Sequence, residues 1–173
     1  MVPAWNETGV IGNMAELAAT TLDYENYHIF VGTYPNDPDT QRDVDEVCAR
    51  FPNVHKVVCA RPGPTSKADC LNNVLDAITQ FERSANFAFA GFILHDAEDV
   101  ISPMELRLFN YLVERKDLIQ IPVYPFEREW THFTSMTTLM SFQNCMAKMF
   151  RCVKPSPDRC PAQESAPVSA AAP

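Results

Sequence analysis

The sequence lacks the features that would place it in several common classes of protein. Its 173 residues contain no apolar run long enough to cross a membrane, and the opening Met-Val-Pro does not resemble a signal peptide. The net charge of −8 leaves no basic surplus, so nucleic acid is not an expected partner. The six cysteines form no CxxC pair. Cys48, Cys59 and Cys70 fall in apolar or helical contexts and are predicted to be reduced core residues, which favours a reducing compartment.

Residues 1–138 alternate between apolar runs typical of strands and stripes of helical spacing. Strands are expected at residues 1–5, 27–31, 54–60, 87–94 and 118–123. Helix starts are predicted at the turn formed by residues 37–39 (Asp-Pro-Asp), at a Ser66–Asp69 capping pair, and at Ser102, where proline and glutamate follow. This order predicts an α/β fold: a mostly parallel sheet flanked by helices.

Polar clusters follow the strands of this predicted sheet. They occupy residues 5–7, 33–37, 61–67 and 96–99. Because the carboxyl ends of parallel strands meet at one edge of a sheet, where ligands usually bind, we expect the four clusters to converge.

The most informative cluster is Asp96, Glu98 and Asp99, which follows the apolar residues 92–94 directly. Carboxylates this close repel one another unless they are solvated or a cation lies on them. Hard oxygen ligands suit Mg²⁺ or Mn²⁺, ions that commonly neutralise phosphates. The motif alone predicts a divalent metal site or, equally, an acidic loop with helix caps.

Residues 2–7, Lys67 with Asn72, and the acidic strand end at residues 96–99 together resemble the family-2 glycosyltransferases of GT-A fold. The resemblance covers residues 1 to about 137 and implies an incomplete, GT-A-like (Rossmann-like) domain. It also implies a hexosyl- or N-acetylhexosaminyltransferase that uses a nucleotide-diphospho-sugar, such as a UDP-sugar, to extend a glycan acceptor at the cytoplasmic face of the bacterial inner membrane. Membrane attachment would come from segments absent from this chain, so the chain itself would be soluble and cytoplasmic.

The resemblance also implies roles for particular side chains. The metal would lie between Asp96 and Glu98, a DxD-like pair, with Asp99 as a further candidate ligand. The donor nucleotide would contact Pro3, Ala4, Trp5, Glu7, Lys67 and Asp96. The family's acceptor-base motif lies downstream of the DxD pair and does not appear in this chain, so we expect no turnover and assign no catalytic base.

Simpler interpretations remain for several of these residues. Glu7 also suits the first turn of a helix, where the macrodipole favours acids, and Lys67 also suits a solvated first turn. Asp99 also suits a loop residue that accepts bonds from backbone amides. A sugar-phosphate nucleotidyltransferase is the alternative enzyme, although residues 2–12 lack its glycine-rich basic loop. A non-catalytic nucleotide-binding or phage-receptor component is the alternative without chemistry.

Residues 139–173 differ in kind from residues 1–138. They hold five prolines and three of the six cysteines, and their charge of +2 contrasts with −10 for residues 1–138. We therefore predict two parts, a donor-binding domain at 1–138 and a largely disordered tail at 139–173. Codons allowed for residues 137–142 encode Tyr-Ile-Asp-Glu-Phe in the neighbouring frame, which resembles the family. The tail is thus interpreted as a frameshift product, in a chain truncated at both ends.

Overall fold

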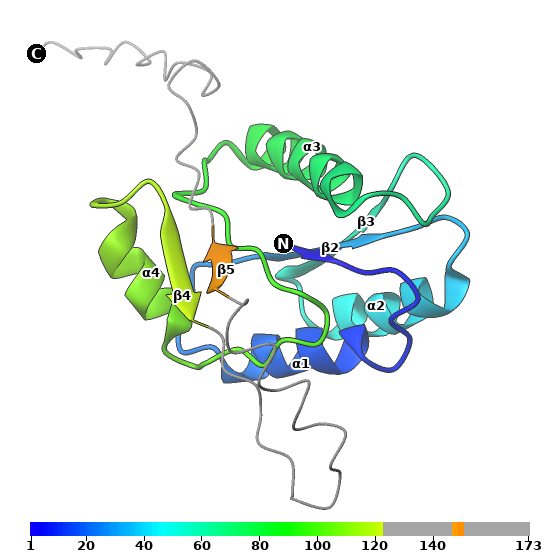
Figure 1. Cartoon of the computed structure of the whole chain (residues 1–173), viewed down its shortest axis with the longest axis horizontal. Helices are drawn as coiled ribbons and strands as arrows, with labels where there is room; N and C mark the ends of the chain where they lie inside the picture. The colour runs from blue at the N-terminus through cyan, green and yellow to red at the C-terminus, as the bar shows by residue number, and fades with distance from the viewer. Residues whose placement is uncertain (123–146, 151–173) are drawn as a thin grey trace, which may run out of the picture.

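A parallel sheet of three strands forms the centre of the computed structural model, which describes residues 1–122 and the backbone of residues 147–150. Its strands, in spatial order, are β1 (Val2–Pro3), β2 (Ile29–Thr33) and β3 (Val54–Val58). One face is covered by α1 (Ile11–Thr21) and α2 (Pro38–Arg50), and the other by α3 (Lys67–Ala85), as Figure 1 shows. Every residue of β2 is buried, as expected for a central parallel strand.

A second, smaller unit follows α3 in the chain. It consists of α4 (Glu105–Val113), β4 (Ile119–Pro122) and β5 (Ala147–Phe150). The two strands pair antiparallel, with Ile119 opposite Phe150. No helix within residues 1–122 combines the length and the apolar character needed to cross a membrane.

The predicted α/β architecture with a parallel sheet is confirmed, and so are the helix starts that depend on local caps. The Asp37 side chain accepts from the Thr40 amide at 3.3 Å, and Pro38 is the first residue of α2. Ser66 Oγ accepts from the Asp69 amide at 3.1 Å at the start of α3.

The strand predicted at residues 87–94 is wrong, because no strand forms there. The segment contacts Met1, the residue before β1, through two backbone hydrogen bonds, from Met1 N to Ile93 O at 2.7 Å and from His95 N to Met1 O at 3.0 Å. A strand at residues 87–94 would need a neighbouring strand with which to exchange backbone hydrogen bonds. Only Met1 precedes β1 in the given chain, so most of the segment has no such neighbour on this side.

Two further predictions about the second unit are wrong. The strand at residues 118–123 does not join the parallel sheet, since β4 pairs with β5 instead. The helix predicted from Ser102 begins at Glu105, and the Met104 cap carries no side-chain hydrogen bond. Glu105 lies 3.0 Å from His95 Nε2, so this acid serves a tertiary ion pair rather than the helix cap. Apart from the backbone of 147–150, the predicted tail lies outside the described residues.

The thiols and the glycine in β2 show how closely α3 packs on the sheet. Cys59 and Cys70 are free and buried, and Cys48 is free and half-buried, as predicted for reduced core residues. A Cβ at Gly32 would lie 2.5 Å from Cys70 Sγ and 2.8 Å from a methyl carbon of Val74. The contact between α3 and β2 therefore depends on the missing side chain at Gly32.

We expect Gly32→Ala to destabilise the domain by about 1–3 kcal/mol, because the added methyl overlaps both neighbours on α3. Gly12→Ala is the matched control: its Cβ would lie 3.4 Å from Asp43 Cβ, an ordinary contact, and alanine favours a helix over glycine by about 1 kcal/mol. Urea unfolding of both variants measures the difference. Equal effects of the two substitutions would contradict the packing argument.

A pair of histidines lies among aromatic rings where β2 and β3 begin. His28 Nδ1 and His55 Nε2 are 2.8 Å apart and share one hydrogen bond, and the rings of Phe30 and Phe81 lie against them. Burial lowers the pKa of both imidazoles, and His28 lowers that of His55 further. The native pair is therefore neutral at pH 7.

Because both pKa values are lower in the folded state than the ordinary 6.5, this pair contributes stability that is present above pH 6.5 and is lost as the pH falls below it. We expect the wild-type chain to lose more unfolding free energy than His55→Phe between pH 7.5 and pH 5.5. The phenylalanine keeps the ring contact and removes one titrating group. Urea titrations at the two pH values measure this, and identical pH dependence in the two proteins would contradict it.

Candidate functional site

Two buried side chains hold the loop between β1 and α1. One is Asp37, the N-cap of α2, and the other is Thr40, in the first turn of α2. The Asn6 amide donates to Asp37 Oδ2 at 2.6 Å, and the Glu7 amide donates to Thr40 Oγ1 at 3.1 Å. Asn6 takes a left-handed backbone conformation with φ +57°, which asparagine tolerates better than most residues. Asp37 and Thr40 are 8% and 0% exposed, so the loop is tied to the interior of the fold.

Trp5 and the two residues before it differ in how deeply they are buried: Ala4 is buried, and Pro3 and Trp5 are half-buried. The indole of Trp5 meets the buried ring of Tyr34 edge-on, with 5.2 Å between the ring centroids. A Cβ at Gly63 would lie 2.5 Å from the same indole, so glycine is needed for this approach. Ala4, predicted to contact the nucleotide, is buried in the core and donates its amide to Gly32 O at 2.8 Å. Pro3 is half-buried in β1.

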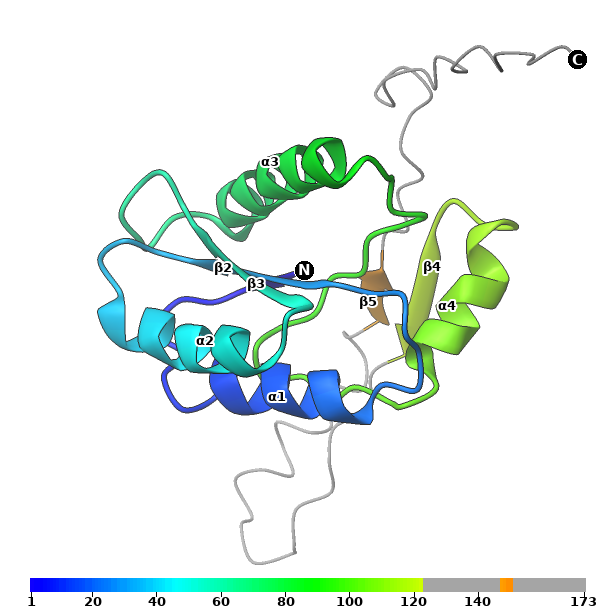
Figure 2. The same cartoon turned by 180° about the vertical axis from the view of Figure 1, so that it is seen from behind.

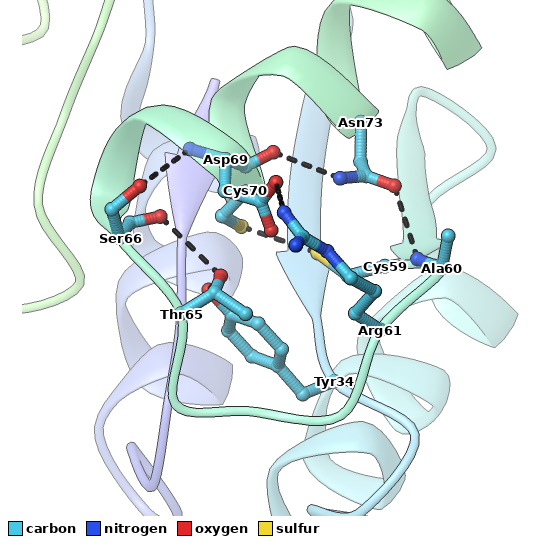
Figure 3. A network of polar contacts seen from close by, with 9 residues as sticks. All are labelled: Tyr34, Cys59, Ala60, Arg61, Thr65, Ser66, Asp69, Cys70 and Asn73. Atoms are coloured by element: carbon cyan, nitrogen blue, oxygen red, sulfur yellow. Dashed lines mark hydrogen bonds and ion pairs between the residues drawn. The ribbon is translucent and has the colours of Figure 1, made fainter.

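The loop that follows β3 is fixed to the first turns of α3, as Figure 3 shows. Arg61 forms an ion pair with Asp69, and this hydrogen bond lowers the pKa of the Asp69 carboxyl. The Ala60 amide donates to Asn73 Oδ1 at 3.0 Å, and the Tyr34 hydroxyl lies 2.9 Å from Thr65 Oγ1. These contacts hold the loop against α3 and against the end of β2.

The same loop is joined to the turn after β2 by a reciprocal pair of hydrogen bonds. Asn36 Nδ2 donates to Gly63 O at 2.7 Å, and the Gly63 amide donates to Asn36 Oδ1 at 2.7 Å. Asn36 is therefore a loop-forming residue, and both polar ends of its amide are engaged.

The acidic segment after residues 92–94 is a tight turn closed by Asp99. The Asp96 amide donates to Asp99 Oδ2 at 2.8 Å, and the Asp99 amide donates to Asp96 O at 3.1 Å. Ala97 is buried at 2% and anchors the turn in the core, while Glu98 is exposed. The Asp99 carboxylate thus shapes the turn, and the turn presents Asp96 and Glu98.

The buried His95 side chain links this turn to α4. Its Nδ1 lies 3.5 Å from Asp99 Oδ2 and its Nε2 lies 3.0 Å from Glu105 Oε1. Burial alone would lower the pKa of His95, but the hydrogen bonds to Asp99 and Glu105 outweigh it, and the net pKa is raised. A buried histidine between two carboxylates is a structural tie between the turn and α4.

Lys67, the first residue of α3, forms an ion pair with the Asp96 carboxylate. This contact joins the loop after β3 to the acidic turn. The family resemblance implies that both residues lie near a donor diphosphate, and the structure brings them into direct contact.

Burial and the nearby acids of the site change the pKa of Glu7. Burial raises the pKa of its carboxyl, and the negative charges of Glu98, Asp37 and Asp96 raise it further. The predicted convergence of the four loops is confirmed, because every loop contacts at least one of the others at this edge of the sheet.

The donor set suits a hard divalent cation only in part. Within residues 1–122, no three histidine, cysteine, aspartate or glutamate side chains are grouped closely enough to chelate a metal ion. Asp96 already holds one cation, the Lys67 ammonium, and the pKa of Glu7 is raised by burial and then by the charges of Glu98, Asp37 and Asp96. Asp96 and Glu98 supply two carboxylates from one turn, so a divalent cation held here would need its remaining ligands from phosphate oxygens or water.

The sequence did not predict that Asp37 and Thr40 hold the loop of residues 5–7. The Asp-Pro signal identified Asp37 as a turn and helix start, which the structure bears out. Its second bond, to the Asn6 amide 31 residues away, leaves no mark on local sequence. Thr40 reads as an ordinary residue of the first helical turn.

We expect Thr40→Val to speed hydrogen exchange at the Glu7 amide and to cost about 1 kcal/mol, because the isosteric side chain removes the acceptor. Thr40→Ser keeps the hydroxyl and serves as the control, with normal exchange at Glu7 despite the lost methyl. Amide exchange measured by NMR distinguishes the two. Unchanged Glu7 exchange in the valine variant would show that the hydroxyl does not hold the loop.

The chain is similar to known proteins over most of its length. The sequence model described as "Glycosyltransferase like family 2" matches residues 1–151. The chain is 94% identical over 148 residues to "Bacteriophage adsorption protein B" of Escherichia coli (strain K12) and, to the same extent, to "Bacteriophage N4 adsorption protein B" of Escherichia coli O157:H7. Each alignment covers 86% of this chain and 20% of the relative, so the chain spans about a fifth of their length. No solved structure matches the chain.

Proposed function

The chain belongs to the glycosyltransferase like family 2, and from this premise we propose that its four converging loops bind a nucleotide-diphospho-sugar, with UDP as the nucleotide. The observation that supports this most directly is the acidic turn, in which Asp96 and Glu98 face the loops of residues 5–7 and 61–67. The predicted boundary at residue 138 stays a prediction, and the family match extends to residue 151.

The proposal assigns a role to each of these side chains. Asp96 and Glu98 would hold a Mg²⁺ or Mn²⁺ ion, which supplies positive charge to a leaving diphosphate when it is bound. Lys67, now on Asp96, would turn toward the donor phosphates. Trp5 and Glu7, on the loop held by α2, would face the nucleoside.

In the whole protein, we propose that this donor site serves transfer of a hexosyl or N-acetylhexosaminyl group to a glycan acceptor at the bacterial inner membrane. For this chain the proposed function is donor binding without turnover. The resemblance places the base that would deprotonate an acceptor hydroxyl on a motif downstream of the acidic turn.

A second candidate rests on the names of the relatives. Both are called bacteriophage adsorption proteins, and identity of 94% favours a shared role for the matching region. In that case the segment would act as a surface component in phage adsorption, and the acidic turn would be a remnant without a ligand.

Calorimetry with UDP and Mn²⁺ separates the two candidates. We expect Asp96→Asn to weaken UDP binding in the presence of Mn²⁺ at least tenfold, because the variant loses a charged metal ligand, and we expect EDTA to abolish binding by the wild type. Asp76→Asn, at an exposed position of α3, is the control and should bind normally.

Equal binding by Asp96→Asn and wild type, or binding that persists in EDTA, would contradict the metal-diphosphate proposal. A folded wild-type chain that binds no UDP would favour the adsorption component.

A further inference from the structure

The first residue of α3 carries a cation that contacts the acidic turn. The Lys67 ammonium forms an ion pair with the Asp96 carboxylate, and the two side chains are 49% and 26% exposed. Arg61, in the same loop, pairs instead with Asp69 in the first turn of α3. In Figures 1 and 2, the green segment that follows α3 runs past the sheet toward α1, and the acidic turn lies on it. The contact of Lys67 with Asp96 therefore joins two segments that are separated in the chain by the whole of α3.

Lys67 lies at the end of a helix that disfavours a cation. The macrodipole of α3 places partial positive charge at its N-terminus, where an acid is stabilised and a lysine is not. The start of the helix is fixed, because Ser66 Oγ accepts from the Asp69 amide at 3.1 Å. The Lys67 ammonium is thus stabilised by an anionic partner, and it changes partner by rotation of its own side chain rather than by movement of the helix.

The carboxylates of the acidic turn differ in what they contact. Asp99 Oδ2 accepts from the Asp96 amide at 2.8 Å and so closes the turn. The Asp96 carboxylate lies on Lys67, and Glu98 is exposed. In the part of the chain that the structure describes, no three acid, histidine or cysteine side chains are grouped to chelate a metal ion. The turn therefore offers a lone divalent cation one exposed carboxylate and a second one that already holds an ammonium.

We propose that the Lys67–Asp96 ion pair is a lysine lock, which keeps free divalent cations off the acidic turn and opens when a diphosphate arrives together with the metal. This inference rests on the proposed function. The diphosphate gives the ammonium a second anionic partner beside the start of α3, and Asp96 becomes available as a ligand. Lys67 thereby couples the two ligands, so that each raises the affinity for the other by the same factor. The site selects for a diphosphate with its metal over the metal alone.

Calorimetry with MnCl₂ and no nucleotide tests the closed lock. Lys67→Met keeps an unbranched side chain and removes its charge, and we expect it to bind Mn²⁺ about fivefold or more tightly than the wild type. Lys67→Arg keeps the cation and should bind Mn²⁺ as weakly as the wild type. The gain should vanish when Lys67→Met is combined with Asp96→Asn, a double variant that measures Mn²⁺ bound elsewhere on this acidic chain.

Lys56→Met is the matched control for loss of a positive charge. Lys56 lies on β3 and forms an ion pair with Asp45 of α2, at 2.6 Å between Nζ and Oδ2. Its removal also breaks a lysine–aspartate pair, but not one that involves the acidic turn. We expect its Mn²⁺ affinity to stay within about twofold of the wild type, because salt screens distant charges.

UDP added together with Mn²⁺ tests the open lock, and here the expected effect has the opposite sign. Lys67→Met should bind UDP about fivefold more weakly than the wild type, because the phosphates lose a charged partner. A lysine that only supports the loop would not strengthen one kind of binding and weaken the other. Melting curves followed by circular dichroism establish that each variant is folded.

Equal Mn²⁺ affinity of Lys67→Met and the wild type would overturn the lock, and so would an equal gain in Lys56→Met. Tighter binding of UDP with Mn²⁺ by Lys67→Met would show that the ammonium only repels the metal, and would overturn the exchange of partners. Failure of the proposed function looks different, because the wild type then binds no UDP with or without Mn²⁺. In that case the opening of the lock by a diphosphate is overturned as well, whatever Lys67→Met does with Mn²⁺ alone.

Discussion

Parallel pairing of β1, β2 and β3 is the constraint on which the rest of this structure depends. Because the three strands run in one direction, the chain returns through a helix each time, and every loop that leaves a strand emerges at the same edge. The direction of the strands alone therefore brings together the loops at residues 5–7, 34–37 and 59–67. The segment that ends at His95 contacts Met1 and brings the acidic turn to the same place.

Some of the acids at this edge build the loops, and two others, Asp96 and Glu98, are carried by the acidic turn. Asp37 caps α2 and holds the Asn6 amide, and Asp99 closes the acidic turn. Asp96 and Glu98 are presented by that turn. Glu7 lies in the field of both, so the site carries more negative charge than Lys67 alone balances. In the proposed function, a metal ion that binds together with the diphosphate would relieve this repulsion.

The same division explains what could be predicted from the sequence. Local signals worked where the contact is local: Ser66 caps α3 and Asp37 caps α2 at a spacing of three residues. Convergence of the loops followed from the strand–helix order alone. Prediction failed where a distant partner decides the outcome. Residues 87–94 have the composition of a strand but meet little of β1, and Glu105 pairs with His95 instead of capping its helix.

A crystal structure of this chain with UDP and Mn²⁺, with diffraction recorded on both sides of the manganese absorption edge, tests the account most directly. The account predicts one strong anomalous peak about 2.2 Å from oxygens of the Asp96 and Glu98 side chains, with the UDP diphosphate completing the coordination and Lys67 turned toward it. An anomalous peak elsewhere, or UDP bound away from the acidic turn with Lys67 still on Asp96, would contradict it.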